Sequence, residues 1–274
     1  MISTSSTTLN NGVQMPWLGF GVFQIPPGET TYNSVRTALQ AGYRAVDTAA
    51  VYGNEADVGR AIRDSGLDRQ QLFLTTKVWI TDHGYDNTLR AFETSKGKIG
   101  LETIDLYLIH WPARAEFTET WRAMERLLQE GQVRAIGVSN FLKHHLQTLI
   151  EKSEVVPAVN QVEFHPFNVQ PALLEFCGEH DIRVEAWSPL IRARYFDHPV
   201  IADIAAAHRC SPAQVMIRWD LQHEVITIPR STQEAHIRQN AEVFDFQLSA
   251  EEMSRLDALD EGMRIGPDPD EFTG

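Results

Sequence analysis

The chain has 274 residues, of which 43% are hydrophobic, and a formal net charge of −13 at pH 7. This length and apolar content are typical of one globular α/β barrel, so we expect residues 1–274 to form a single domain. The negative charge argues against nucleic-acid binding, which needs clustered Lys and Arg side chains.

The first expected element is a β-hairpin over Thr8–Gln14, centred on Asn10-Asn11-Gly12. Eight short aliphatic or β-branched runs follow it and alternate with longer amphipathic segments. Most of these runs are continuously apolar, as parallel strands covered on both faces are. The expected strands are Leu18–Gly21, Tyr43–Asp47, Leu72–Lys77, Ile104–His110, Val133–Val138, Ala158–Val162, Arg183–Trp187 and Val225–Ile228.

The segments between the strands are expected to be helical. Asn54 has the side chain of an N-cap residue, ahead of a helix that buries Val58 and Ile62. A later helix ends at Gly131 and has an apolar face formed by Trp121, Met124 and Leu128. Polar strand ends recur about every 30 residues, which is the length of one strand, one helix and their loops. The pattern predicts a (β/α)8 TIM barrel, with the hairpin as a plug at its N-terminal end.

Four polar residues end or follow consecutive expected strands, where the active sites of such barrels form. They are Asp47, Tyr52, Lys77 and His110. Each could have an ordinary structural role when taken alone, such as a helix cap, a rim aromatic or a core histidine. An ammonium at the end of an apolar strand, however, needs a counter-charge, and Asp47 is the obvious partner of Lys77. Together the four predict a catalytic group.

These residue types suit the reduction of a carbonyl group. We expect Lys77 to stabilise the Tyr52 phenolate and so to lower the pKa of the phenol. Asp47 would keep Lys77 charged, and His110 would hydrogen-bond the carbonyl oxygen. Tyr52 would then protonate that oxygen as a hydride arrives at carbon.

The expected cofactor site does not follow the Rossmann pattern. Gly19-Phe20-Gly21 lacks a third glycine and fits packing of the first strand better. Polar groups instead gather at the ends of the later strands, where side-chain amides suit a carboxamide, an indole suits a nicotinamide ring, and a guanidinium suits phosphate. Each of them could equally belong to an ordinary loop or cap. These residues are Ser139, Asn140, Gln161, Trp187, Ser188, Arg230, Ser231 and Thr232.

The sequence as a whole resembles the aldo-keto reductases, especially the bacterial 2,5-diketo-D-gluconate reductase and prostaglandin F synthase-like branch. The resemblance spans nearly the whole chain. It is carried by the segments 42–49 (GYRAVDTA), 52–55 (YGNE), 76–79 (TKVW), 105–112 (DLYLIHWP), 136–141 (IGVSNF), 160–166 (NQVEFHP) and 228–231 (IPRS).

The resemblance implies that Asp47, Tyr52, Lys77 and His110 form the catalytic tetrad, with Tyr52 as the general acid. It implies that Ser139, Asn140 and Gln161 hold the carboxamide and that Trp187 packs on the nicotinamide. Leu190 and Asn240 complete the implied cofactor contacts, and the resemblance also implies a monomer.

Two departures from the family pattern concern the choice of cofactor. Arg230 replaces a lysine, which keeps the charge, and His236 replaces an arginine that contacts the adenosine 2′-phosphate. Arg238 lies two residues further on a different helix face and is a doubtful substitute. We therefore expect NADPH to be preferred and NADH to be used as well.

The expected substrate pocket is apolar and permissive, with Phe23, Trp79 and Trp111 as its walls. We expect the tail Arg264–Gly274 to fold over its mouth, beside a short loop at about 190–198. Arg192 and Arg194 in that loop are expected to be solvated. The substrates would be aldehydes and ketones, including α-dicarbonyls or keto sugars.

Two alternatives remain open from the sequence. One is a Schiff-base aldolase with Lys77 as the nucleophile, which the neighbouring Asp47 disfavours because a carboxylate keeps lysine protonated. The other is a nicotinamide-binding regulatory subunit with little turnover.

No feature indicates a metal or a special location. Cys177 and Cys210 are far apart and lack ligand-like spacing, so neither a disulfide nor a metal site is expected. The segment Met1 to Leu9 lacks the basic and apolar regions of a signal peptide, and no apolar run is long enough to span a bilayer. We expect a cytoplasmic protein that binds neither membranes nor nucleic acids.

Overall fold

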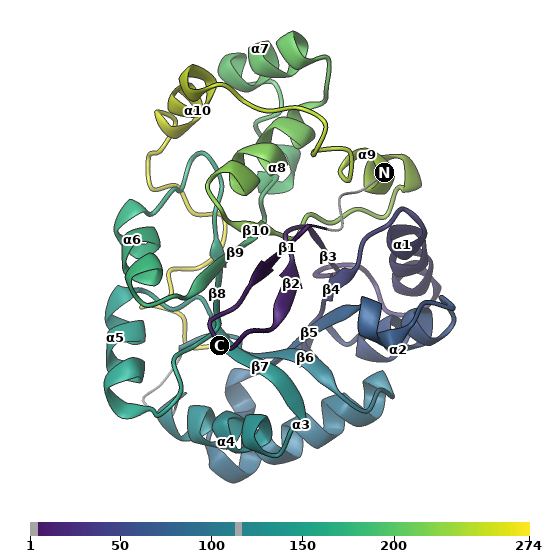
Figure 1. Cartoon of the computed structure of the whole chain (residues 1–274), viewed down its shortest axis with the longest axis vertical. Coiled ribbons are helices and arrows are strands. Elements are labelled where there is room, and N and C mark those ends of the chain that lie inside the picture. Colours follow the sequence, from purple (N-terminus) through teal and green to yellow (C-terminus); the bar gives the residue numbers. More distant parts are fainter. Residues whose placement is uncertain (1–4, 113–116) are drawn as a thin grey trace.

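The computed structural model describes residues 5–112 and 117–274, so the first four residues of the Met1 to Leu9 segment lie outside the described residues. Eight parallel strands follow one another in chain order from β3 to β10 in one sheet. The sheet closes on itself where Leu18 bridges Thr227 and where the Gly21 N–H donates to the Pro229 carbonyl at 3.2 Å. Helices surround this barrel (Figure 1), which confirms the expected (β/α)8 fold.

The strands of the barrel are β3 (Gly19–Gly21), β4 (Ala45–Asp47), β5 (Phe73–Val78), β6 (Ile104–Ile109), β7 (Val133–Ser139), β8 (Val159–Glu163), β9 (Arg183–Trp187) and β10 (Ile226–Thr227). The helices are α1 (Glu29–Gln40), α2 (Glu55–Arg63), α3 (Tyr85–Ile99), α4 (Phe117–Gln129), α5 (Lys143–Lys152), α6 (Pro171–Glu179), α7 (Pro199–His208), α8 (Pro212–Gln222), α9 (Glu234–Gln239) and α10 (Ala250–Asp257). Single 3-10 turns lie at η1 (Ala50–Tyr52), η2 (Arg69–Gln71), η3 (Ile80–Asp82) and η4 (Ile191–Ala193).

All eight expected strands are present, and their ends differ from the expected ones by at most two residues. β4 begins at Ala45 because the N–H of Tyr43 still bonds back to the Ala38 carbonyl of α1. Lys77 is the last residue but one of β5 rather than its end, and His110 follows β6 directly.

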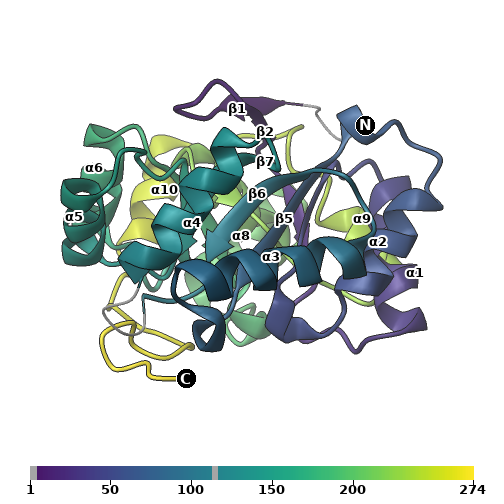
Figure 2. The ribbon, with the colours of Figure 1, turned by 90° about the horizontal axis from the view of Figure 1, so that it is seen from below.

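The N-terminal hairpin consists of β1 (Ser6–Thr8) and β2 (Gln14–Pro16), paired antiparallel. Its apolar side chains Leu9 and Met15 pack on residues of the barrel interior, among them Phe73 and Leu106. The hairpin and the C-terminal tail lie at opposite ends of the barrel (Figure 2), so the expected plug is confirmed.

Gly19 and Gly21 make the closure of the barrel possible. A Cβ at Gly19 would lie 2.9 Å from Ile228 Cγ2, and one at Gly21 would lie 2.9 Å from the Ile228 carbonyl oxygen. The two glycines thus let β3 approach the chain after β10, as the strand-packing interpretation predicts.

The helical expectations hold with one correction. α4 buries Trp121 and Met124 and is followed by Gly131 at φ 69°. Asn54 precedes α2, but its side chain makes no cap hydrogen bond. Its Nδ2 instead donates to the carbonyls of Val22 and Ile25, because the residue is buried between the first two barrel loops. Within the described ranges, no helix combines the length and the apolar character needed to cross a membrane.

Candidate active site

The four residues of the expected catalytic group come together at the C-terminal end of the barrel. Lys77 Nζ donates to both carboxylate oxygens of Asp47 at 2.7 Å and to the Thr48 carbonyl at 2.9 Å. Tyr52, carried by η1, places its hydroxyl 3.4 Å from the same nitrogen. The His110 ring lies edge-on to the Tyr52 ring, with centroids 5.5 Å apart.

Asp47 holds Lys77 in its charged form. The Lys77 side chain is 0% exposed, and such burial by itself lowers the pKa of an ammonium. The charges of Asp47, Tyr52 and Glu185 and the hydrogen bond to Asp47 outweigh that effect and raise the pKa of Lys77 above its usual value. Lys77 is therefore a cation at neutral pH.

Lys77 lowers the pKa of Tyr52, as expected, but burial of the phenol has the larger effect. Burial raises the pKa of the phenol to about 12, and Lys77 offsets only part of that rise. Burial has the larger effect because the phenolate loses more hydration free energy than its interaction with one ammonium at 3.4 Å restores. Tyr52 is therefore fully protonated at neutral pH, which is the form that a proton donor requires.

His110 is uncharged in this setting. Burial and the nearby Lys77 cation lower its pKa well below the usual value of histidine. A neutral imidazole can donate one hydrogen bond into the cavity without adding a second cation beside Lys77.

A cavity of about 980 Å³ opens at this end of the barrel. Asp47, Tyr52 and His110 form part of its wall, whereas Lys77 lies behind them. Every residue expected to bind cofactor also lines the cavity, as does every residue expected to bind substrate. These residues are Ser139, Asn140, Gln161, Trp187, Ser188, Leu190, Arg230, Ser231, Thr232, His236 and Asn240, and then Phe23, Trp79 and Trp111.

The two amides of the expected carboxamide site have different surroundings. Asn140 Oδ1 accepts from Trp187 Nε1 at 2.8 Å, while its Nδ2 donates to the His110 carbonyl at 2.9 Å and to Ser139 Oγ at 3.0 Å. The amide of Asn140 thus orients the indole. Gln161 donates from Nε2 to two carboxylates, and no described residue donates to its Oε1.

Two arginines, Arg192 and Arg230, and one histidine, His236, also line the cavity. Arg230 is exposed on the cavity wall, and burial of part of its side chain together with the charge of Arg192 lowers the pKa of its guanidinium. Neither arginine has a carboxylate partner among the described residues. Unlike His236, Arg238 does not line the cavity and pairs with Glu234 at 2.8 Å.

The C-terminal tail completes the aromatic wall. The Phe272 ring lies 4.2 Å from that of Trp111 and 5.9 Å from that of Trp79, measured between centroids. Trp79 also packs edge-on against His110 at 5.0 Å. The tail therefore folds over the mouth as expected, and Phe272 is a wall residue that the sequence interpretation did not single out.

Glu163 at the end of β8 anchors the start of the tail. Its carboxylate accepts the backbone N–H of Ile265 at 2.6 Å and that of Gly266 at 3.0 Å. It also hydrogen-bonds His165 Nε2 at 3.0 Å. Gly266 lies so close to Trp187 that an added Cβ would be 2.5 Å from the indole, so a larger residue there would displace the tail or the indole.

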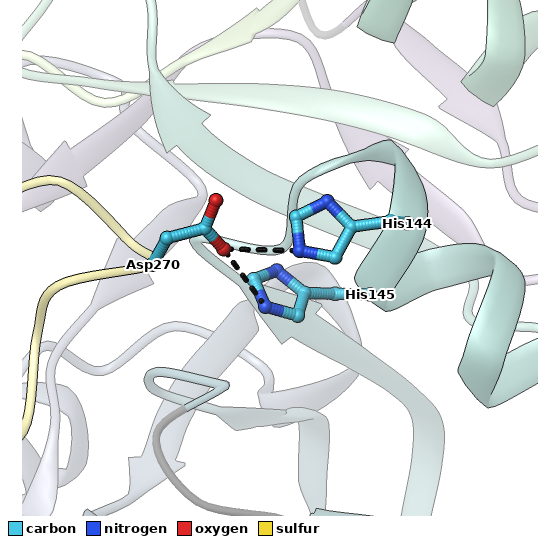
Figure 3. Close-up of side chains that lie close together, drawn as sticks. All are labelled: His144, His145 and Asp270. Carbon is cyan, nitrogen blue, oxygen red and sulfur yellow. Dashed lines mark ion pairs between the residues drawn. The ribbon is translucent and has the colours of Figure 1, made fainter.

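A second anchor joins the tail to α5 (Figure 3). Asp270 Oδ1 lies 3.0 Å from His144 Nε2 and 3.3 Å from His145 Nε2. These three groups are close enough together to hold a metal ion. His145 Nδ1, however, accepts the Leu142 N–H, so in the neutral ring the proton sits on Nε2 and faces Asp270. The arrangement fits a hydrogen-bonded contact between tail and helix.

Comparison with known proteins agrees with this geometry. The pattern of the Aldo/keto reductase family matches residues 18–261. An uncharacterized oxidoreductase, YtbE, of Bacillus subtilis is 54% identical over 98% of this chain and 97% of its own length. A glyoxal reductase of the same organism is 51% identical over 96% of each chain. An aldo-keto reductase of Bombyx mori, solved in complex with NADP, superposes with a TM-score of 0.93 at 33% identity, over 98% of this chain and 97% of that one.

The chain therefore belongs to the aldo/keto reductase family. It is an oxidoreductase, and the expected reaction class, carbonyl reduction with a reduced nicotinamide cofactor, is confirmed.

Proposed function

We propose that the enzyme reduces aldehydes and ketones with NADPH and that Tyr52 donates the proton. The observation that carries this proposal is the Lys77 ammonium, buried between Asp47 and the Tyr52 hydroxyl at the wall of the cavity. A carbonyl compound, one hydride equivalent and one proton give the alcohol, and the nicotinamide cofactor supplies the hydride when bound.

In this mechanism His110 and Tyr52 hydrogen-bond the carbonyl oxygen and polarise it. As the carbon accepts the hydride, the C=O π bond breaks and its electron pair moves to oxygen. The O–H bond of Tyr52 then breaks, and its proton goes to that oxygen. An alkoxide is a much stronger base than a phenolate, so a phenol with a pKa of about 12 still transfers its proton. Lys77 stabilises the phenolate until solvent returns a proton.

The residues present suit a nicotinamide cofactor. Gln161 Oε1 is free to accept from a carboxamide NH2 group, and Trp187, whose indole N–H donates to Asn140, lines the cavity where a ring could stack on it. Arg230 and Arg192 supply positive charge for phosphates. We propose NADPH as the preferred cofactor, with appreciable use of NADH because His236 lacks a permanent charge.

The substrate that we propose is a small carbonyl compound, including α-dicarbonyls. The similarity to a glyoxal reductase and the aromatic wall of Phe23, Trp79 and Trp111 support this class. We further propose that the whole chain acts as one domain, as a monomer and in the cytoplasm. The two alternatives fit less well, because a protonated Lys77 is a poor Schiff-base nucleophile and a regulatory subunit has no need of the tetrad.

The proposal is tested by following NADPH and NADH oxidation with a panel of aldehydes, α-diketones and keto sugars. We expect turnover of several of these substrates and a higher kcat/KM with NADPH. Equal or better efficiency with NADH would refute the cofactor preference. Borohydride trapping of substrate on Lys77, without cofactor oxidation, would favour the aldolase.

A further inference from the structure

Glu185 is a buried acid that the mechanism above does not use. It is the central residue of β9 and is 1% exposed. It lies two residues before Trp187, on the same face of the strand, yet it does not line the cavity. No Lys or Arg among the described residues lies within ion-pair distance of it.

The contact of Glu185 with the active site runs through Gln161, its register partner on β8. Gln161 Nε2 donates to Glu185 Oε2 at 2.7 Å and to Asp47 Oδ2 at 2.8 Å. Both protons of the amide nitrogen are thereby used, because a primary amide has two. The amide is held with its nitrogen between the two carboxyl groups, and its oxygen is left for the cavity.

We propose that Glu185 is a positioning residue of this enzyme, which holds the oxygen of Gln161 toward the nicotinamide carboxamide. The proposal rests on the proposed function, since it assigns a carboxamide to Gln161. Glu185 acts only through its neighbours and does not itself touch a ligand.

The charge of Glu185 matters because of the groups around it. Asp47 on β4, Lys77 on β5 and Tyr52 on η1 are its titratable neighbours, and its partner on β10 is the uncharged Ile226. Burial and the Asp47 charge raise the pKa of Glu185 to about 8, although Gln161 and Lys77 partly offset them. Above that pH a second negative charge stands beside Asp47, and this charge is one of the causes of the raised pKa of Tyr52.

A consequence for pH dependence follows. Below about pH 8 Glu185 is neutral, and Tyr52 is the stronger acid. As the pH rises through about 8, ionised Glu185 makes proton donation harder, so kcat for reduction falls. Glu185→Gln mimics the neutral form and keeps an acceptor for Gln161, so we expect it to remove this alkaline limb.

The experiment compares wild type with Glu185→Gln and Glu185→Leu. It measures kcat from pH 6 to 10 and the Kd of NADPH by fluorescence. It also follows the pH titration of the 13C carboxyl resonance of Glu185, which is assigned by its loss in Glu185→Gln. In Glu185→Leu the amide of Gln161 loses one of its two anchors, so we expect the Kd of NADPH to rise roughly fivefold. Asp220→Asn is the matched control, because Asp220 is also a buried acid but does not line the cavity. Its carboxyl group accepts a hydrogen bond from Thr227 Oγ1 at 2.6 Å. Asp220→Asn should leave the Kd and the pH profile unchanged.

An alkaline limb that persists in Glu185→Gln, or a Glu185 resonance that titrates below pH 6, overturns the charge part of the proposal. An unchanged Kd in Glu185→Leu overturns the positioning part. If the leucine variant does not fold, the pH profile of Glu185→Gln still tests the charge part. The NMR titration needs neither substrate nor turnover. If the chain reduces no carbonyl compound but Glu185 titrates near pH 8, the proposed function is refuted. The raised pKa of the buried Glu185 carboxyl group is then still supported.

Discussion

The hydroxyl of Tyr52 lies 3.4 Å from Lys77 Nζ and is the most distant of the four oxygens that this nitrogen contacts. Asp47 and the Thr48 carbonyl hold the ammonium at 2.7 to 2.9 Å. The contact with Tyr52 can therefore shorten when negative charge forms on the phenol oxygen, which is the change that proton donation requires.

Removal of one partner of the buried Asp47 and Lys77 pair should destabilise the fold strongly. We expect Lys77→Met and Asp47→Asn each to lower the free energy of unfolding by about 3–5 kcal/mol, because each leaves an uncompensated buried polar or charged group. The double variant should lose clearly less than the sum of the two. Urea denaturation measures all three. Arg126→Met, at an exposed ion pair with Glu130, should leave the unfolding midpoint unchanged. Additive losses would contradict a direct coupling of Asp47 and Lys77.

Replacement of His236 by arginine should sharpen the choice of cofactor. His236 lies on the cavity wall and is exposed, so an added guanidinium can reach an anionic group there. A charge-assisted hydrogen bond is worth about 1.5–3 kcal/mol, so we expect the ratio of kcat/KM for NADPH over NADH to rise about tenfold or more. Steady-state kinetics with both cofactors gives the ratio. Arg238→Ala is the control and should not change it, since Arg238 pairs with Glu234. A ratio that stays constant in His236→Arg would place the 2′-phosphate elsewhere.

The anchor of the tail at Glu163 should weaken in acid. Burial alone would raise the pKa of this carboxyl, but His165 and the backbone N–H groups of Ile265 and Gly266 lower it below the usual value. The stabilisation that the Glu163 carboxylate gives to the folded tail is therefore fully present above the usual pKa of glutamate, about 4.3. It is lost as the pH falls through the lower pKa of Glu163 in the folded state.

Hydrogen exchange, corrected for intrinsic rates, measures this anchor at the amides of Ile265 and Gly266. We expect protection of both amides at pH 7 and loss of it below about pH 4. Glu163→Gln should lower the protection at pH 7, while Glu151→Gln on the exposed face of α5 should not. Equal protection in wild type and Glu163→Gln would mean that other contacts hold the tail.

The barrel was predictable from the sequence because its strands are continuous apolar runs and the polar residues that end them recur at regular intervals. The contact of Lys77 with Asp47 was predictable for a related reason, since a lysine in a buried strand requires a counter-charge nearby, and Asp47 ends the preceding strand. The role of Asn54 was not predictable, because its residue type favours helix capping, whereas carbonyls of a neighbouring loop bind its amide in the fold.

Properties that depend on packing between distant segments were not predictable. The net rise in the pKa of Tyr52 comes from burial that only the folded loops produce. Glu185 interrupts an apolar strand two residues before Trp187, and that break in the pattern was the one signal of its position. The contact of Asp270 with His144 joins residues that are far apart in the chain, and no local pattern marks it.

The most direct test of the central claim is the single-turnover rate of hydride transfer in Tyr52→Phe, with NADPH binding measured on the same sample. Loss of the phenol proton should slow the reduction by roughly 10²–10⁴-fold, while the Kd of NADPH stays within about twofold of wild type. If Tyr52→Phe reduced an aldehyde at a rate close to that of wild type, Tyr52 would not be the proton donor.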